Sequence, residues 1–464
     1  MAEIFKGIRR HIHLIGIGGI GVSGIARLLL RQGIKVSGSD LKENSLTEEL
    51  RRLGVKIFIG HNPTNILGAQ LVIYSSAIRE DNPEIVEAKR QGIPLMRRAE
   101  ALAELMKEKT IIAVTGSHGK TTTASLISYL LLEAGFLPTL AVGGILRNID
   151  TNAWWGDGKY FVAEADESDG SFLCYRPNYS VITNIDYEHL DYYKDFQNEL
   201  EAFRKFISNT KRDGCVFGCA DDKNLTDMLT NCRKRYVLFG FDSASHIYPR
   251  NVQLDALNSQ FDCFYGNRFL ARFNLSLAGL HNISNALSVV ALGLELGIDI
   301  EVIKKTLINY RGTHRRMEVK LEDTRYMVID DYAHHPTEIK ATLSAIRNLK
   351  SKRIIAIFQP HRYSRTRLLL DEFSRSFQLA DCVVITDIYS ANETPIEGVS
   401  SKGIYERLKQ EFPDKPIDFL SKENIVEYIL KIIKPNDLVI TLGAGDITKI
   451  CDGLVERLKG KDKV

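Results

Sequence analysis

The segment "VTGSHGKTTT", residues 114–123, contains the Gly-Lys-Thr of a phosphate-binding loop. The usual pattern, Gly-x-x-x-x-Gly-Lys-Ser/Thr, would place a glycine where this chain has Val114. An apolar run precedes the loop and a helical pattern follows it, so Val114 belongs to the strand and the loop is tighter than usual. Lys120 could contact the β- and γ-phosphates of a nucleotide, and the hydroxyl of Thr121 or Thr122 could bind Mg²⁺. A chance turn is the alternative interpretation.

A second glycine-rich loop, "GIGGIGVSG", lies near the N-terminus. Gly16, Gly18 and Gly21 have the Gly-x-Gly-x-x-Gly spacing between a predicted strand and a predicted helix. Backbone without side chains can approach a pyrophosphate at the positive end of that helix. Asp40 ends the next predicted strand and could bind a ribose hydroxyl. Alone, the motif is also typical of NAD or FAD sites, or of a turn that packs a helix on a strand.

Two acidic segments could supply oxygen ligands for Mg²⁺. The first, "AEADESDGSF", follows a predicted strand and contains Glu164, Asp166, Glu167 and Asp169. The second, "ITNIDYEHLDYY", ends the next predicted strand and contains Asp186, Glu188 and His189. Both would lie at the edge where open α/β sheets bind ligands. A solvated acidic surface is the alternative, and histidine is an unusual ligand of Mg²⁺.

Three later segments, "RGTHRRME", "DDYAHHPTE" and "FQPHRYSRTR", are rich in arginine and histidine. Arg315 and its neighbours could bind the transferring phosphoryl group, or could form a basic surface between domains. Arg362 and Arg365 follow a predicted strand and could bind a small carboxylate. His334 or His335 is a candidate base, although a capping or packing role is equally plausible for either alone.

Strand-then-helix alternation recurs in three segments and predicts three α/β domains. We expect the domains to cover residues 1–106, 107–312 and 313–464. The first and third are expected to be Rossmann-like. The second is expected to be of the phosphate-loop ATPase type, with an antiparallel excursion in the β-rich region 212–275.

Composition limits the classes of partner. The 61 Lys and Arg residues nearly balance 58 Asp and Glu, so no global basic field favours nucleic acid. Seven scattered cysteines without a zinc pattern favour reduced thiols. No run of about 18 apolar residues predicts membrane insertion. We therefore expect a cytoplasmic protein, present as a monomer or a weak homo-oligomer.

The ordered motifs resemble those of the Mur ligases of peptidoglycan synthesis. The resemblance runs through all three segments, in "GIGGIGVSGIA", "TGSHGKTTT", "EADESDGSF", "TNIDYEHLDYY", "LAGLHNISNALSVVALG", "RRME", "DDYAHHPTEI", "QPHRYSRT" and "GAGDI". Each motif is moderately specific, and their ordered combination is highly specific. The shortened phosphate loop is the usual form in this family.

The resemblance implies that the first domain binds UDP-N-acetylmuramate, the second ATP with one or two Mg²⁺ ions, and the third L-alanine. The UDP-sugar would contact Gly16, Gly18, Gly19, Gly21, Asp40, Ser75 and Ser76. ATP would contact Gly116, Ser117, His118, Gly119, Lys120, Thr121, Thr122, Asn282, Asn285, Arg315, Asp330 and Asp331. L-alanine would contact Tyr332, His361, Arg362 and Arg365. Metal would be held by Thr121, Glu164 and His189. The expected catalytic residues are Lys120, Glu164, His189, Arg315, His334 and His361.

The chemistry implied by the resemblance has two steps. A carboxylate of the UDP-sugar attacks the γ-phosphate to give an acyl phosphate and ADP, and the alanine amine then displaces phosphate. His334, His335 or His361 is the candidate base for that amine. Closure of the third domain is expected to keep water from the acyl phosphate.

One departure and three alternatives stay open. Several Mur ligases carry a carbamylated lysine about 15 residues after the metal-binding histidine, and Arg204 stands there, with Lys205 next to it. We expect the second metal to be held without a carbamate. The alternative within the family is a recycling ligase that attaches a preformed peptide. An NAD-dependent oxidoreductase or a phosphate-loop switch would leave most of the other motifs unexplained.

Overall fold

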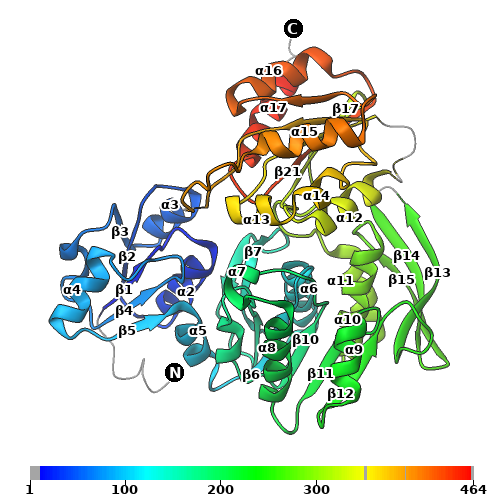
Figure 1. The fold of residues 1–464 in the computed structure, drawn as a ribbon. Helices are drawn as coiled ribbons and strands as arrows, with labels where there is room; N and C mark the ends of the chain where they lie inside the picture. Colours follow the sequence, from blue (N-terminus) through cyan, green and yellow to red (C-terminus); the bar gives the residue numbers. More distant parts are fainter. Residues whose placement is uncertain (1–10, 256, 348, 350–352, 392, 461–464) are drawn as a thin grey trace. The chain divides into compact units, whose positions relative to one another are not determined.

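The computed structural model describes residues 11–255, 257–347, 349, 353–391 and 393–460 (Figure 1). The chain forms two compact units. The first contains residues up to Arg250, with Asp262–Phe273 and Ser284–Arg311. The second contains Asn251–Phe261, Asn274–Ile283 and the chain from Gly312 onward. In the described part of the chain, no helix is long and apolar enough to cross a membrane.

The N-terminal sheet is parallel throughout, with the strand order β3-β2-β1-β4-β5. Its strands are β1 (Ile12–Ile15), β2 (Val36–Asp40), β3 (Lys56–Ile59), β4 (Leu71–Tyr74) and β5 (Leu95–Arg97). Its helices are α2 (Ile20–Arg31), α3 (Ser45–Arg52), α4 (Pro83–Gln91) and α5 (Arg98–Met106). The strand order reverses between β1 and β4, and the crevice at such a point is where open α/β sheets bind ligands.

The central sheet has the order β15-β14-β13-β12-β11-β10-β6-β9-β7-β8. Its strands before the excursion are β6 (Thr110–Thr115), β7 (Thr139–Leu146), β8 (Thr151–Trp154), β9 (Tyr160–Glu164), β10 (Tyr179–Ile182), β11 (Cys215–Cys219) and β12 (Arg235–Phe239). The associated helices are α6 (Lys120–Glu133), α7 (Leu190–Tyr193), α8 (Phe196–Asn209), α9 (Lys223–Thr230), α10 (Leu280–Glu295) and α11 (Ile300–Asn309). Because β9 and β10 are the neighbours of β6, the loops after these three strands lie side by side.

The antiparallel excursion is shorter than the predicted region 212–275. Strand β11 pairs with β10 in parallel, and β12 pairs with β11 in parallel, so both extend the main sheet. The excursion consists of β13 (Ile247–Asp255), β14 (Asn258–Tyr265) and β15 (Arg268–Leu275). Only two residues join each of these strands to the next, and a parallel connection needs a dozen or more, so these neighbours run antiparallel.

The C-terminal sheet has the order β16-β17-β21-β18-β19-β20 and is parallel except at its edge strand β16. Its strands are β16 (Glu318–Glu322), β17 (Tyr326–Asp331), β18 (Ile354–Phe358), β19 (Cys382–Ile385), β20 (Ile417–Phe419) and β21 (Asp437–Leu442). Its helices are α12 (Pro336–Arg347), α13 (Tyr363–Leu368), α14 (Leu370–Ser374), α15 (Ser401–Glu411), α16 (Lys422–Ile432) and α17 (Thr448–Gly460).

Two apolar cores cover the two faces of this sheet. Alternate residues of β18 enter different cores: Ala356 and Phe358 pack with α12, α14 and α15, whereas Ile355 and Ile357 pack with α16 and α17. This alternation explains why the strand is a continuous apolar run in the sequence. The predicted α/β class with three domains is confirmed, and the predicted domain boundaries stay a prediction.

Two fully buried glutamates of the first unit have opposite surroundings. Glu84 accepts hydrogen bonds from Ser39 and Asn65, both at 2.6 Å, and lies 3.2 Å from His13 Nε2. Burial alone would raise the pKa of Glu84, but these hydrogen bonds lower it below its ordinary value. Glu199 of α8 accepts no hydrogen bond of normal geometry at either oxygen, and burial raises its pKa to about 8.

We predict that Glu199→Gln raises the melting temperature by about 2 °C or more at pH 9 and changes it little at pH 5. The folded pKa of Glu199 lies above the ordinary value of 4.5, so folding favours the protonated acid. The wild-type protein therefore loses stability as pH rises from about 4.5 to about 8, and the neutral amide avoids that loss.

Glu201→Gln is the matched control, since Glu201 lies on the same helix with its side chain 71% exposed. An equal shift in both variants, or a shift that does not grow with pH, would contradict this account of Glu199.

Candidate active site

The phosphate loop connects β6 to α6 and is fixed by the segment after β10. The backbone N–H of Ser117 donates to the Asn184 carbonyl at 3.0 Å, and that of His118 donates to the Asn184 side chain at 2.9 Å. Gly119 caps α6 with a φ of 82°, and a Cβ there would lie 2.6 Å from Asn285 Oδ1. This position requires glycine, and Asn285, a residue predicted to contact ATP, lies directly against the loop.

The ammonium group of Lys120 lies over this loop. It donates to the carbonyls of Gly116 at 2.6 Å and Ser117 at 3.0 Å, and to Glu167 Oε1 at 2.6 Å. Burial alone would lower the pKa of Lys120, but Glu167 and Asp166 raise it well above its ordinary value. Lys120 therefore stays charged and can compensate negative charge at the N-terminus of α6.

Two of the predicted metal ligands meet at the start of α6. The Thr121 hydroxyl donates to Glu164 Oε1 at 3.0 Å, and the other Glu164 oxygen accepts the Gly143 N–H at 2.7 Å. Glu164 ends β9, so the strand order places it beside the loop that follows β6. Thr121 and Glu164 thus present hard oxygen donors side by side, which is the ligand type that Mg²⁺ prefers.

The third predicted metal ligand, His189, is held by carboxylates. Its Nε2 lies 3.2 Å from Glu167 Oε1 and 3.6 Å from Glu188 Oε2. Burial alone would lower the pKa of His189, but these two carboxylates raise it above its ordinary value. Glu167 Oε1 is therefore shared by Lys120 and His189. The sequence placed Glu167 in an acidic segment, yet its central position depends on pairing between strands, which no local motif reveals.

His118 and Thr122 complete the predicted phosphate loop. His118 Nε2 lies 2.9 Å from Asp186 Oδ2, which connects the loop to the second acidic segment. Asp186 was not among the predicted site residues, although the sequence placed it in that segment. Thr122 is half-buried in the first turn of α6. Asn282, which was predicted to contact ATP, donates its side-chain amide to the Ala278 carbonyl at 2.7 Å.

The N-terminal glycine loop follows β1, and α2 begins after Gly19. The Gly18 N–H donates to Asp40 Oδ2 at 2.9 Å, and a Cβ on Gly18 would lie equally close to that oxygen. Ser75, which follows β4, lies next to Gly16, whereas Ser76 is exposed. The structure therefore gathers most of the predicted UDP-sugar residues at the reversal point of the sheet, next to the N-terminus of α2, which attracts anions.

Arg315 is anchored at the C-terminal edge of the third sheet. Its guanidinium donates to the Gly443 carbonyl at 2.6 Å and lies 3.4 Å from Asp330. Asp330 also accepts the hydroxyls of Thr441 and Thr448, both at 2.7 Å. Asp331 accepts the backbone N–H groups of Met317 and Ala333, and burial raises its pKa to about 6. Asp330 therefore holds side chains at this edge, and Asp331 holds the backbone.

The residues predicted to bind L-alanine gather at the same edge. His361, Arg362 and Arg365 follow β18, and Tyr332 follows β17. The His334 ring lies 5.4 Å from the Tyr332 ring and 5.5 Å from the His361 ring. Arg315 and Arg316 place their guanidinium groups 5.1 and 4.9 Å from the centre of the Tyr332 ring. This cluster of arginines and aromatic rings suits a small carboxylate.

Burial, with the nearby His334, Arg365 and Arg362, lowers the pKa of His361 to about 2. The imidazole is therefore neutral at physiological pH and a weak proton acceptor. Its Nδ1 lies 3.5 Å from Arg365 Nη1, so it is oriented to accept from that guanidinium. These surroundings favour a binding role for His361 over the predicted role of base.

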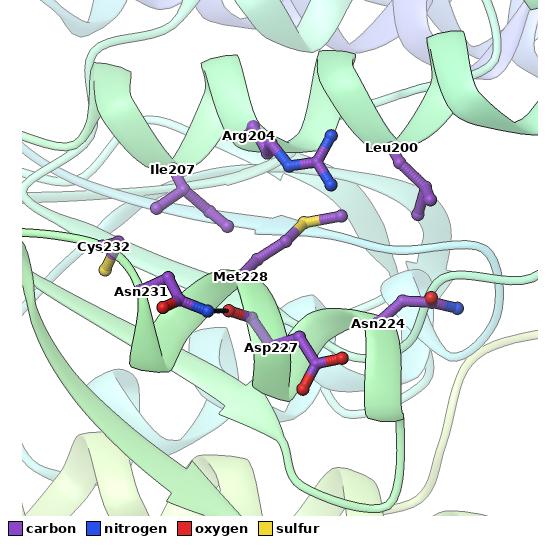
Figure 2. Close-up of a pocket in the computed structure, with 8 residues that line it drawn as sticks. All are labelled: Leu200, Arg204, Ile207, Asn224, Asp227, Met228, Asn231 and Cys232. Atoms are coloured by element: carbon purple, nitrogen blue, oxygen red, sulfur yellow. Dashed lines mark hydrogen bonds between the residues drawn. The ribbon is translucent and has the colours of Figure 1, made fainter.

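The described part of the first unit also contains a cavity of about 380 Å³ that is not lined by the phosphate loop (Figure 2). It lies between α8 and α9 and is lined by Leu200, Arg204, Ile207, Asn224, Asp227, Met228, Asn231 and Cys232.

Arg204 pairs with Glu201 at the surface, and Lys205 is exposed. Glu199 lies on the buried face of the same helix, α8, and interacts electrostatically with His189.

Three models of the Mur ligase family match consecutive parts of the chain. The family's "catalytic domain" matches residues 11–110, its "middle domain" residues 114–293, and its "glutamate ligase domain" residues 315–445. A UDP-N-acetylmuramate–L-alanine ligase of Geotalea uraniireducens is 44% identical over 450 residues, which are 97% of this chain and 98% of that protein.

Solved structures show the same likeness. A UDP-N-acetylmuramate–alanine ligase from Thermotoga maritima superposes with a TM-score of 0.85 at 32% identity, covering 97% of this chain and 99% of that chain. A murein peptide ligase from Psychrobacter arcticus shares the fold with a TM-score of 0.74 at 24% identity, covering 97% of this chain and 98% of that chain. Since the matches extend through all three sheets, the chain belongs to the Mur ligase family.

Proposed function

We propose that this enzyme joins L-alanine to UDP-N-acetylmuramate in peptidoglycan precursor synthesis, converting ATP to ADP and phosphate. The observation that carries the proposal is the 44% identity, over nearly the full length of both proteins, to a ligase named for these two substrates. The structure supports it with a candidate group of residues for each substrate. A murein peptide ligase shares the fold at 24% identity, which leaves a preformed peptide as the alternative acceptor.

Each substrate has a separate set of residues in the proposal. The backbone of the N-terminal glycine loop would hold the UDP pyrophosphate, and Lys120 with the phosphate loop would hold ATP. Arg362 and Arg365 would hold the alanine carboxylate.

The family matches support domain boundaries near residues 106 and 312. The first match ends at residue 110 and the second begins at 114; the second ends at 293 and the third begins at 315.

Thr121, Glu164 and His189 would hold Mg²⁺, which would offset the negative charge of the phosphates. Lys120 would neutralise the oxygens of the γ-phosphate while the carboxylate of the UDP-sugar attacks it to form an acyl phosphate. Because two anions must approach one another in this step, the buried positive charge of Lys120 contributes most there.

The seven free cysteines support a reducing, cytoplasmic location.

We propose His334 as the base for the alanine amine. Its Nδ1 lies 3.1 Å from the Tyr332 carbonyl, which can only accept, so Nδ1 carries the proton and Nε2 the lone pair. His335 has the opposite arrangement, because its Nδ1 accepts the Thr337 N–H at 3.3 Å. The low pKa of His361 makes it a weak acceptor. The hydrogen bonds of His334 and His335, together with the low pKa of His361, therefore support His334 among the three histidines that the sequence left open.

The acceptor is tested by phosphate release from ATP in the presence of UDP-N-acetylmuramate and L-alanine, L-serine, glycine or a peptide. We expect release only when the UDP-sugar and an acceptor are both present, with the highest kcat/KM for L-alanine. Preference for the peptide would establish the recycling ligase instead. Rapid ATP hydrolysis without the UDP-sugar would contradict the ligase chemistry altogether.

Lys120→Ala is expected to reduce kcat by at least about 100-fold, because the transferring phosphoryl group loses its buried cation. The Kd for UDP-N-acetylmuramate, measured by calorimetry, is expected to stay unchanged since its proposed site uses other residues. Lys205→Ala, which removes an exposed lysine of α8, serves as the control. A parallel loss of UDP-sugar binding in Lys120→Ala would refute the separation of the two sites.

His334→Asn retains a side-chain N–H for the Tyr332 carbonyl and removes Nε2. We expect a fall in kcat of about 100-fold or more, with the acyl phosphate still formed and trapped by hydroxylamine. Raising the pH should restore part of the rate because more of the free amine is deprotonated. His335→Asn is the comparison, and a larger effect in that variant would move the role of base to His335.

A further inference from the structure

The loop after β19 contacts the proposed alanine residues at several points. The Tyr389 ring stacks on the His361 ring at 5.7 Å between centres, with 15° between their planes. The Tyr389 carbonyl accepts the Arg362 N–H at 2.9 Å, and its own N–H donates to the Pro360 carbonyl at 2.8 Å. One residue therefore supports both the ring of His361 and the backbone on either side of it.

These contacts hold a conformation that Arg362 would not adopt by itself. Its φ of 70° and ψ of 139° lie in a region that residues with a Cβ rarely occupy. Such a conformation persists only where neighbouring contacts fix it, and the hydrogen bond to Tyr389 is one of them. The direction in which the Arg362 side chain leaves the backbone therefore depends on Tyr389.

Glu393 acts on the next turn. Its carboxylate accepts the Ser364 N–H at 3.1 Å and the Ser364 hydroxyl at 2.6 Å. Ser364 lies in the first turn of α13, where backbone N–H groups have no partner within the helix. The negative charge of Glu393 also stabilises this end of the helix. Glu393 thereby fixes the start of the helix that carries Arg365.

The Tyr389 ring also packs against a further loop. A Cβ on Gly445 would lie 2.5 Å from Tyr389 Cγ, so the ring packs against bare backbone of the loop after β21. Loops from β18, β19 and β21 therefore meet at Tyr389. The ring has little freedom to move away from His361, even though 37% of the residue is exposed.

We propose that Tyr389 and Glu393 are positioning residues for the amino-acid substrate. Tyr389 sets the orientation of His361 and Arg362, and Glu393 sets that of α13 with Arg365. The proposal rests on the proposed function, in which these three residues bind the acceptor. It predicts that loss of either contact weakens acceptor binding selectively, because a carboxylate needs both arginines in a fixed relative direction.

The test measures KM for all three substrates, together with kcat and melting temperature, in Tyr389→Ala, Tyr389→Phe, Glu393→Ala and Glu393→Gln. We expect Tyr389→Ala and Glu393→Ala to raise the acceptor KM about tenfold or more, with the KM for ATP and for the UDP-sugar unchanged. Tyr389→Phe should have the same acceptor KM as the wild-type enzyme because it keeps the stacked ring. Glu393→Gln should give an intermediate value because it keeps one acceptor oxygen.

Glu397→Ala is the control, since Glu397 is an exposed carboxylate of the same connection. An unchanged acceptor KM in both alanine variants would overturn the proposal. The proposal would also be overturned if every variant had a lower melting temperature, a lower kcat and a higher KM for all three substrates. That pattern indicates a purely structural role. The acceptor used is the one that the wild-type enzyme prefers in the panel above, so a preference for another acceptor would refute L-alanine as substrate without affecting this comparison.

Discussion

The candidate ATP site depends on the charge interactions that the buried carboxylate of Glu167 makes with its neighbours. It is fully buried, so its charge must be compensated by its neighbours. One oxygen lies 2.6 Å from the Lys120 ammonium and 3.2 Å from His189 Nε2. These partners come from the loops after β6 and β10, so a single carboxylate fixes the two sides of the site.

All three sheets have their candidate ligand-binding residues in the loops after the carboxyl ends of parallel strands. In the N-terminal sheet the loop after β1 leads into the N-terminus of α2, with Asp40 and Ser75 beside the loop. In the C-terminal sheet the loops after β17, β18, β19 and β21 converge on Tyr332, His361 and Tyr389. The residues that could contact a ligand thus follow the carboxyl ends of the strands in each sheet.

Strand and helix periodicity was sufficient to predict the three sheets and the two glycine loops, because those signals are local. The excursion was placed too early, since apolar runs such as Cys215–Cys219 do not reveal whether their partner strand is parallel. Tyr389 and Glu393 were missed for another reason. Their partners His361 and Ser364 lie 28 and 29 residues earlier in the chain, and only the pairing of β18 with β19 brings them together. The family resemblance singled out Arg204, which is exposed, whereas the buried ionisable residue of the same helix is Glu199.

Backbone strain occurs at three of the candidate site residues, and no sequence motif reveals it. His189, Arg315 and Arg362 have φ values of 57°, 61° and 70°, in the left-handed region that favours glycine. Each is held by hydrogen bonds from nearby backbone: the His189 carbonyl accepts from Tyr192 and Tyr193, the Arg315 carbonyl accepts from Tyr332, and the Arg362 N–H donates to Tyr389. Strain of this kind costs about 1–3 kcal/mol at each residue and persists only where the fold imposes it. A glycine at these positions would relieve the strain but would remove the imidazole or guanidinium that the proposed function uses.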